Sequence, residues 1–442
     1  MAYIQIKSSN PKFSYIIKKN PQSSMALKSV RLGTGAGYFS KDDESTYNIF
    51  FQDSSTEISY PEYKDQNFEY INTTRYSSSL FVLNVLYDFL RDTIRTLQEN
   101  DVSDVYENSV ICNMIPMQGA KMLSAFIRHF PDYEIVLKNV AGKHYQAAFK
   151  TKKSLFCLLN LVSLFMVFNA IRNKQEYISV DENVVEKYLK AAQILDAPYF
   201  IKYNFKVFIL RSPALFEKYK GILESSATQK LNFLFGDTNK MRLDFAKKYL
   251  LPKTSRQKSI VDIGCGEGYY LFNLSKKMEY ESYHAIDINE EVLYTLSRKA
   301  NFRKMENVFT YNSFDLFLEK YNTDVPLNFI CMEVIEHMSQ EDAAELVSKC
   351  IKHPRFNSLV LTTPNKDFNS LYFDDEDDTF RHVDHKFEFT EEEFREWVLK
   401  LNFNLVFPDN PKDICNIGHD IFEVGDIVDG KPVSWGLWVY KK

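Results

Sequence analysis

Three glycines at alternate positions, Gly264, Gly266 and Gly268, constrain the fold of this 442-residue chain more than any other feature. A mostly apolar run at residues 259–263 predicts a short buried strand before them, and residues 270–277 have the spacing of an amphipathic helix. Glycine lets the backbone turn sharply and lets a ligand approach without meeting a Cβ atom. A strand, a glycine turn and a helix in this order indicate a nucleotide-binding turn.

An acidic residue beyond the turn narrows the choice of nucleotide. A second predicted strand, residues 283–287, ends in Asp287, where a carboxylate can bind both hydroxyls of a nucleoside's ribose. The turn lacks the Lys-Ser/Thr of a phosphate-binding loop, and Glu267 within it would repel a pyrophosphate. The sequence therefore favours S-adenosylmethionine, whose nucleoside carries no phosphate, over NAD or ATP. The alternative is an ordinary strand–helix turn that binds nothing.

The same residues resemble motifs I and II of the class I methyltransferases. The matching pattern is Asp262, the three glycines at alternate positions and the strand-end Asp287. The resemblance implies a Rossmann-like α/β domain in which Asp262, Gly264, Gly266, Gly268 and Asp287 bind S-adenosylmethionine. Ser313 follows a third predicted strand and can touch the adenine of the cofactor, although a turn serine without such a contact is an equal alternative.

The length of the chain predicts two domains. A polar, lysine-rich segment at residues 224–258 surrounds one predicted helix, and we place the domain boundary within it, giving domains 1–230 and 231–442. Lys, Arg, Asp and Glu give the first domain a net charge of +5 and the second a net charge of −10. A domain with that negative charge attracts a long phosphate backbone poorly, so we expect any contact with nucleic acid there to be local.

The N-terminal domain has the patterns of an α+β fold but no chemical motif. We predict short strands, with turns at Gly33, Gly35 and Gly37, and a long helix capped by Ser77, Ser78 or Ser79. The predicted strands are residues 3–6, 13–17, 27–32 and 48–51, and the predicted helices are residues 80–97, 118–129, 154–172, 182–194 and 213–225.

Three features bear on the compartment of the protein. Residues 155–171 are mostly apolar, but the run is short and contains Asn160 and Asn169, so we expect a buried helix rather than a membrane span. The first 25 residues carry several lysines and no apolar run, which argues against a signal peptide. The six cysteines form no C-x-x-C pair. We therefore expect reduced thiols and a cytoplasmic protein without a membrane partner.

Acidic and histidine residues follow the next predicted strand, residues 327–332. Glu333, Glu336 and His337 begin where this strand ends, and the carboxyl ends of parallel strands carry the site in open α/β sheets. Two carboxylates and one imidazole suit Mg²⁺ or Mn²⁺ better than a structural zinc. The alternative is a helix start whose first turn carries acids because the helix dipole favours them.

A second cluster follows the predicted strand at residues 358–363. Residues 381–390 contain His382 and His385, and one of these histidines can complete a set of two glutamates and two histidines. Thr390 and Glu393 form a predicted capping box for a helix at residues 391–401.

Together these motifs resemble the RNA 3′-terminal ribose 2′-O-methyltransferases, the family that methylates small RNAs in plants and animals. The resemblance implies that Glu333, Glu336, His337 and His385 hold a divalent cation, Mg²⁺ or Mn²⁺, and support catalysis of methyl transfer from S-adenosylmethionine to the 2′-OH of the 3′-terminal nucleotide. The matching pieces, within residues 240–400, are Asp262–Gly268, Glu333–His337, Thr363–Asn365 with Phe368-Asn369, and Asp384–Glu388.

The first half also resembles the N-terminal half of the long bacterial members of that family. Asn10-Pro11 with Tyr15, Arg75-Tyr76 with residues 77–79, and the helix at residue 155 fall in similar places. The resemblance implies a role in RNA repair with a bacterial polynucleotide kinase–phosphatase–ligase as partner, bound through the N-terminal half, which supports ligation.

Two other functions are compatible with parts of the sequence. One is a catalytically silent assembly subunit of an RNA-repair complex, which the intact set of two glutamates and two histidines argues against. The other is a metal-dependent O-methyltransferase for small diols such as catechols. The large N-terminal half and the Asp384–Glu388 motif argue against that alternative.

Overall fold

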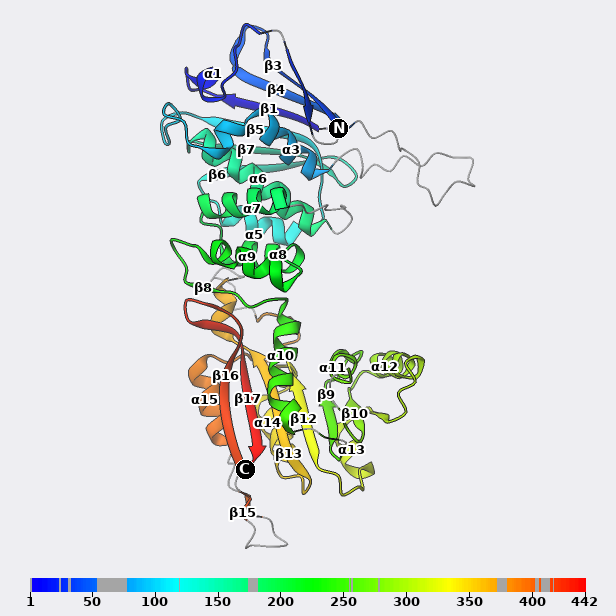
Figure 1. Ribbon diagram of the computed structural model, residues 1–442. Helices are drawn as coiled ribbons and strands as arrows, with labels where there is room; N and C mark the ends of the chain where they lie inside the picture. The colour runs from blue at the N-terminus through cyan, green and yellow to red at the C-terminus, as the bar shows by residue number, and fades with distance from the viewer. Residues whose placement is uncertain are drawn as a thin grey trace, which may run out of the picture. The chain divides into compact units, whose positions relative to one another are not determined.

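The structure is a computed structural model that divides into two compact units, residues 1–229 and residues 230–442 (Figure 1). Arg75, Tyr76 and Ser77 lie outside the described residues. The structure describes residues 2–23, 25–30, 33–53, 78–118, 120–173, 182–253, 255, 257–276, 279–371, 380–401, 405–406, 414–415 and 417–442.

The N-terminal unit contains a seven-stranded antiparallel sheet in the order β2-β3-β4-β1-β5-β7-β6, with helices packed against it. This arrangement confirms the α+β class predicted for the first half. The strands are β1 (Ala2–Ser8), β2 (Ala26–Val30), β3 (Gly33–Ser40), β4 (Asp43–Asp53), β5 (Asn108–Pro116), β6 (Tyr133–Ala141) and β7 (His144–Thr151). The helices are α1 (Phe13–Ile16), α3 (Ser79–Phe89), α4 (Arg91–Arg95), α5 (Ala120–Arg128), α6 (Leu155–Arg172), α7 (Glu182–Ile194), α8 (Tyr199–Phe208) and α9 (Pro213–Glu224).

Two predictions about the first 40 residues are wrong. Residues 13–17 were predicted as a strand but contain α1, because the side chain of Asn10 accepts a hydrogen bond from the backbone N–H of Lys12 and starts a turn. The predicted turn glycines instead lie in β3. A Cβ atom on Gly35 would stand 2.5 Å from the ring of Phe89, so the absence of a side chain lets α3 pack directly on the strand.

The long helix predicted at residues 80–97 is divided in two. Ser78 caps α3 by accepting a hydrogen bond from the N–H of Leu80, and the break at Leu90 separates α3 from α4. Among the helices in the part of the chain that the structure describes, α6 alone is long and apolar enough to cross a membrane. Most of this helix is buried within the unit. Its first turn is held by Asp101, whose carboxylate accepts hydrogen bonds from the N–H groups of Leu155 and Phe156 at 2.7 Å each. The structure thus places α6 as a core helix.

The C-terminal unit contains an eight-stranded sheet in the order β11-β10-β9-β12-β13-β17-β16-β8 (Figure 1). The first five strands in this order are parallel, and the last three are antiparallel to their neighbours. The strands are β8 (Leu231–Asn232), β9 (Ser259–Ile263), β10 (Tyr283–Ile286), β11 (Val308–Tyr311), β12 (Leu327–Met332), β13 (Phe356–Pro364), β16 (Ile417–Val428) and β17 (Lys431–Lys441). This sheet confirms the predicted Rossmann-like methyltransferase fold.

Helices cover both faces of this sheet. Helices α10, α11 and α12 contribute buried residues to one face, and α13, α14 and α15 contribute to the other. The helices are α10 (Thr238–Leu250), α11 (Tyr269–Leu274), α12 (Glu290–Phe302), α13 (Phe314–Lys320), α14 (Gln340–Ile351) and α15 (Glu391–Lys400), with short 3₁₀ turns η2 (Leu251–Lys253), η3 (Ile335–His337) and η4 (Lys366–Leu371). Thr390 and Glu393 form the predicted capping box of α15.

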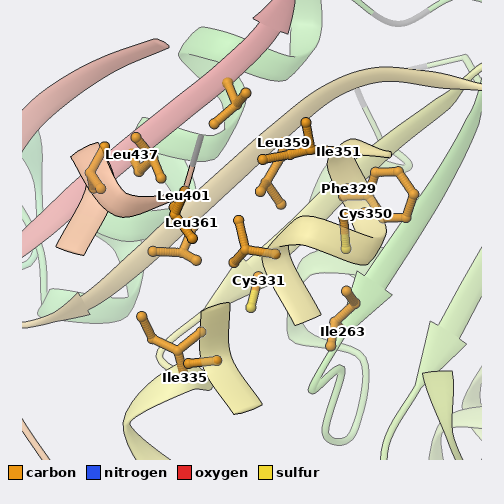
Figure 2. Packing of buried hydrophobic residues seen from close by; sticks show 14 of the residues in the cluster. Ile263, Phe329, Cys331, Ile335, Cys350, Ile351, Leu359, Leu361, Leu401 and Leu437 are labelled. Carbon is orange, nitrogen blue, oxygen red and sulfur yellow. The ribbon is translucent and has the colours of Figure 1, made fainter. Parts of the chain in front are cut away.

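Alternate residues of β12 pack on opposite faces of the sheet. Phe329 and Cys331 lie on the α14 face, where Figure 2 shows them among Leu359 and Leu361 of β13, whereas Ile330 lies on the α10 face. Burying a side chain of this kind stabilises the fold by about 1.5–3 kcal/mol. Because the parallel strands are covered on both faces, their side chains are committed to the core, and the loops at their carboxyl ends remain for chemistry.

Candidate functional site

The glycine turn forms a compact corner at the carboxyl end of β9. Gly264, Gly266 and Gly268 have φ values of +71°, +50° and +88°, a region that residues with a Cβ atom rarely adopt. A Cβ atom on Gly264 would stand 2.4 Å from the side chain of Val334. The turn therefore packs directly against the loop that carries Glu333 and Glu336.

Asp287 lies beside this turn, as the nucleotide-binding pattern requires. Its Oδ2 atom accepts a hydrogen bond from the N–H of Gly266 at 2.9 Å, and its Oδ1 atom accepts one from the N–H of Asn289 at 2.9 Å. These bonds fix the carboxylate at the mouth of the turn. Glu267 points elsewhere and forms an ion pair with Lys299 of α12.

The structure gives Asp262 and Ser313 protein partners. Asp262 is buried, accepts a hydrogen bond from the hydroxyl of Tyr283 at 2.7 Å, and has a pKa raised to about 7 by its burial. Ser313 caps α13 by accepting a hydrogen bond from the N–H of Leu316 at 3.1 Å. The contacts of both residues with the cofactor stay predictions.

Three of the four predicted metal ligands converge. Glu336 and His337 lie in η3, directly after β12, and His385 lies in the loop before α15. One ligand atom from each of these residues lies within 4.8 Å of the other two. The N–H of Lys386 donates a hydrogen bond to the carbonyl oxygen of Glu336 at 2.7 Å, which ties the two segments together.

A buried network orients these ligands. The Nδ1 atom of His385 lies 2.6 Å from Oε1 of the fully buried Glu388, so that this nitrogen donates and Nε2 remains free for an ion. Glu388 is held in turn by the side-chain amide of Asn369 at 2.5 Å, and Thr363 donates its hydroxyl to Oε2 of Glu336 at 3.1 Å. The sequence motifs include Thr363, Asn369 and Glu388, but their roles as supports appear only in the structure.

Glu333, the fourth predicted ligand, has a different partner. Its backbone has φ +54°, and its carboxylate forms an ion pair with Arg242 of α10, which also donates to Ser434 Oγ at 3.1 Å. Sequence reasoning missed Arg242, because no motif distinguishes it from the other cations of the segment before β9. It reaches the site only because α10 packs against the sheet.

The chemistry of the residues fits a divalent cation. Among the described residues, one oxygen of Glu336 and one of Glu333 are buried and accept no hydrogen bond. Burial, and then the charge of Glu333, raises the pKa of Glu336 well above its usual range. Burial and the neighbouring His385 lower the pKa of His337, which favours the neutral imidazole that can bind a metal. A cation at this position would satisfy the buried oxygens.

His382 stands at the edge of this cluster. The side chain of His382 is 60% exposed, whereas that of His385 is 8% exposed. The Nδ1 atom of His382 lies 3.4 Å from the carboxylate of Asp384. The ring centroids of His382 and His385 are 5.7 Å apart. The geometry thus favours His385 as the better-oriented ligand.

The chain is similar to known proteins in both halves. A methyltransferase domain model matches residues 260–355, which include the glycine turn and the Glu333–His337 segment. The chain is similar to small RNA 2′-O-methyltransferases: that of Arabidopsis thaliana is 28% identical over 184 residues, covering 37% of this chain and 19% of that protein. That of Mus musculus is 30% identical over 153 residues, covering 33% of this chain and 38% of that protein. The chain spans less than two thirds of the length of these relatives.

Solved structures reproduce the whole fold. A chain of the Pnkp1/Rnl/Hen1 RNA repair complex aligns with a TM-score of 0.79 and 23% identity, covering 99% of this chain and 100% of that chain. A chain of a second Pnkp1/Rnl/Hen1 complex aligns with a TM-score of 0.76. A family model, the Hen1 N-terminal domain, matches residues 3–228. Because that match covers more than half of the sequence, the chain belongs to the family defined by the Hen1 N-terminal domain, and it carries a methyltransferase domain in its second half.

Proposed function

We propose that this protein transfers a methyl group from S-adenosylmethionine to the 2′-OH of the 3′-terminal nucleotide of RNA. The observation that carries this proposal is the convergence of Glu336, His337 and His385 at the same sheet edge as the glycine turn and Asp287. Contact between the turn and the loop after β12 brings a nucleoside site and a metal-binding set together. The named activity of the relatives, small RNA 2′-O-methylation, supports the same conclusion.

In this proposal the glycine turn and Asp287 bind the nucleoside part of the cofactor. Asp287 is already fixed by two backbone N–H groups and accepts hydrogen bonds from the ribose hydroxyls with its remaining lone pairs. Gly266 has open space where its side chain would be, so the cofactor can approach the backbone. Asp262 lies two residues before the turn, and its carboxylate accepts a hydrogen bond from the hydroxyl of Tyr283.

Glu333, Glu336, His337 and His385 would hold the divalent cation, Mg²⁺ or Mn²⁺. When bound, such an ion supplies chelation of the 2′ and 3′ hydroxyls and lowers the pKa of the 2′-OH. Thr363 and Glu388 keep Glu336 and His385 in place, so the protein contributes mainly by positioning the acceptor hydroxyl near the methyl group.

This arrangement accounts for selection of an RNA end. A 3′-terminal ribonucleotide presents a vicinal 2′,3′ diol, whereas an internal nucleotide has a phosphodiester at the 3′ position and DNA lacks the 2′-OH. A site built to grip the diol therefore recognises the RNA 3′ end by its chemistry rather than by its base sequence.

We also propose that the protein acts in the cytoplasm with a polynucleotide kinase–phosphatase–ligase, bound through the N-terminal half. Similarity over the full length to a chain of an RNA repair complex supports this proposal. Two full-length variants would test which half binds, one with surface substitutions in residues 1–229 and one with surface substitutions in residues 230–442. If the N-terminal half binds the ligase, only the first variant should fail to pull it down.

The decisive experiment compares RNAs that differ only in the terminal ribose. We expect methylation of the 2′,3′ diol and little or none of the 3′-phosphate, 2′-deoxy or 3′-deoxy forms. The 3′-deoxy form keeps the acceptor and removes only the second chelating oxygen. Brisk methylation of that form would contradict the diol grip, and faster turnover of a catechol than of RNA would favour a small-molecule enzyme.

A further inference from the structure

Helix α12 presents an exposed row of side chains that its packing does not require. Tyr294, Arg298 and Phe302 are spaced four residues apart and therefore lie on one side of the helix. Tyr294 is 66% exposed and Phe302 is 90% exposed, whereas Leu293 and Leu296 face the core. The guanidinium of Arg298 lies 5.8 Å from the centroid of the Tyr294 ring, within cation–π range.

Positive charge gathers at the end of the same helix. Arg298, Lys299, Arg303 and Lys304 fall within seven residues, in a half of the chain with a net charge of −10. Arg303 lies over the ring of Phe272 at 4.1 Å, which brings the end of α11 beside the end of α12. Because Lys299 forms an ion pair with Glu267, the positive charge of this segment comes mainly from Arg298, Arg303 and Lys304, on a domain that is acidic as a whole.

Ordinary helix chemistry explains only part of this pattern. Cations at a helix C-terminus interact favourably with the helix dipole, and the stem of Arg303 covers apolar surface on Phe272. Neither effect accounts for two aromatic rings left in water on the same side of the helix as Arg298. Two exposed rings that flank a cation on one side of a helix are complementary to a polyanion with flat, stacking faces, because bases stack on the rings and phosphates are attracted to the cation.

We propose that the row Tyr294–Arg298–Phe302 binds single-stranded RNA upstream of the 3′-terminal nucleotide. Bases stack on Tyr294 and Phe302, and phosphates are attracted to Arg298 and the cations that follow the helix. The inference rests on the proposed function. Helix α12 starts just after Asp287, at the site edge of the sheet, and extends about 20 Å from it, so the row contacts nucleotides upstream rather than the terminal ribose.

The test uses the full-length protein and two RNAs with a 2′,3′ diol, a trinucleotide and a strand of about 16 nucleotides, the upper size of a single-strand site. In the variant Tyr294→Ala/Phe302→Ala, the dissociation constant for the longer RNA should rise about tenfold or more, since each stacked base contributes substantially. Its turnover of the trinucleotide should match that of the unchanged protein. Arg298→Ala should reduce the slope of log affinity against log salt by about 0.7, the value for one phosphate contact.

A matched control is available on α15, where Arg395 and Leu399 are also four residues apart and exposed. Arg395→Ala/Leu399→Ala should leave both RNAs unaffected. Unchanged affinity of the Tyr294→Ala/Phe302→Ala variant for the longer RNA would overturn the proposal and assign the row to a protein partner. A fall in trinucleotide turnover as large as the fall in affinity for the longer RNA would also overturn the proposal, because it would place the effect at the catalytic centre. Affinity is measured by fluorescence anisotropy without turnover, so absence of methylation in the unchanged protein would count against the proposed function alone.

Discussion

The guanidinium of Arg242, on helix α10, donates a hydrogen bond to the carboxylate of Glu333. The side chains of the two residues are 13% and 17% exposed. Glu333 also has a left-handed backbone, which is unfavourable for a residue with a Cβ atom. Arg242 therefore neutralises a nearly buried acid at a strained position, and this acid is itself one of the four proposed metal ligands.

Replacement of Arg242 should destabilise the C-terminal unit. Arg242→Ala leaves the Glu333 carboxylate nearly buried and unpaired, and we expect the free energy of unfolding to fall by about 2–3 kcal/mol. Urea unfolding followed by tryptophan fluorescence measures this, because Trp397, Trp435 and Trp438 are all the tryptophans of the chain and all lie in this unit.

The matching control is the exposed pair of Lys240 and Asp244 on the same helix. Lys240→Ala should cost less than about 1 kcal/mol, because water screens an exposed pair. The double variant Arg242→Ala/Glu333→Ala should lose less than the sum of the two single changes, since no unpaired acid remains. Strict additivity of the two losses would show that the pair is not coupled.

The two histidines of the loop before α15 should differ in metal binding. His385 is oriented by Glu388, whereas His382 is mostly exposed. We expect His385→Ala to abolish Mn²⁺ binding in calorimetry and to abolish turnover, while S-adenosylmethionine binding is kept. His382→Ala should cost much less, and chelation of the metal should stop turnover in the unchanged protein. Equal loss of Mn²⁺ affinity in both variants would require a ligand set that includes His382.

Loss of the Asp287 carboxylate should weaken the cofactor. Asp287→Ala removes both the predicted ribose acceptor and the partner of the Gly266 N–H. The dissociation constant for S-adenosylmethionine should therefore rise about tenfold or more, which corresponds to a loss of at least roughly 1.4 kcal/mol of binding free energy. Asp315→Ala, which removes an exposed acid paired with Lys349, is the control. Calorimetry that finds the same affinity in both variants would remove Asp287 from the cofactor site.

The buried His284 should make the stability of the C-terminal unit depend on pH. Burial lowers the pKa of His284 to about 4. Its ring lies beside the rings of Phe309 and Phe317, and its two nitrogens form hydrogen bonds with the hydroxyls of Ser282 and Tyr311. The unfolded chain, with an ordinary histidine pKa of about 6.5, binds more protons between these two values. The free energy of unfolding should therefore fall as pH drops from about 6.5 to 4, by up to about 3 kcal/mol.

His284→Phe should remove that part of the pH dependence, because phenylalanine keeps the aromatic contacts and cannot be protonated. Tryptophan fluorescence during urea unfolding at several pH values gives the comparison. An identical fall in both proteins would assign the pH dependence to other groups.

Local patterns predicted much of the methyltransferase unit. Apolar runs, the glycine turn and the capping box predicted strands β9, β10, β12 and β13 and helices α11 and α15 with small errors at their ends, whereas α13 and α14 have no counterpart among the predictions. Because parallel strands bring their carboxyl ends to one edge, the sequence also predicted that the segment with Glu333, Glu336 and His337 would lie at the same edge as the glycine turn, and Val334 of that segment packs against Gly264. Such predictions succeed where each element is buried on both faces and its pattern is therefore strong.

The N-terminal unit was less predictable from local patterns. Strands β5, β6 and β7 have no counterpart among the sequence predictions. In β5 the buried Val110 and Cys112 alternate with Ile111, which is apolar although it is only partly buried, so the alternation of apolar and polar residues is weak. The glycines of β3 were misassigned for a related reason, since their role is to admit Phe89 of α3.

The sequence by itself determined the glycine turn and the strand that precedes it, the chemical type of the site residues and the family resemblance. Only the tertiary structure decided which supports hold them: Arg242 against Glu333, Glu388 against His385, and Thr363 against Glu336. The first of these pairs joins residues 91 positions apart. Hydrogen bonds and ion pairs act over a few ångströms, and a local pattern does not encode which distant segments come within that distance once the sheet and its helices have packed.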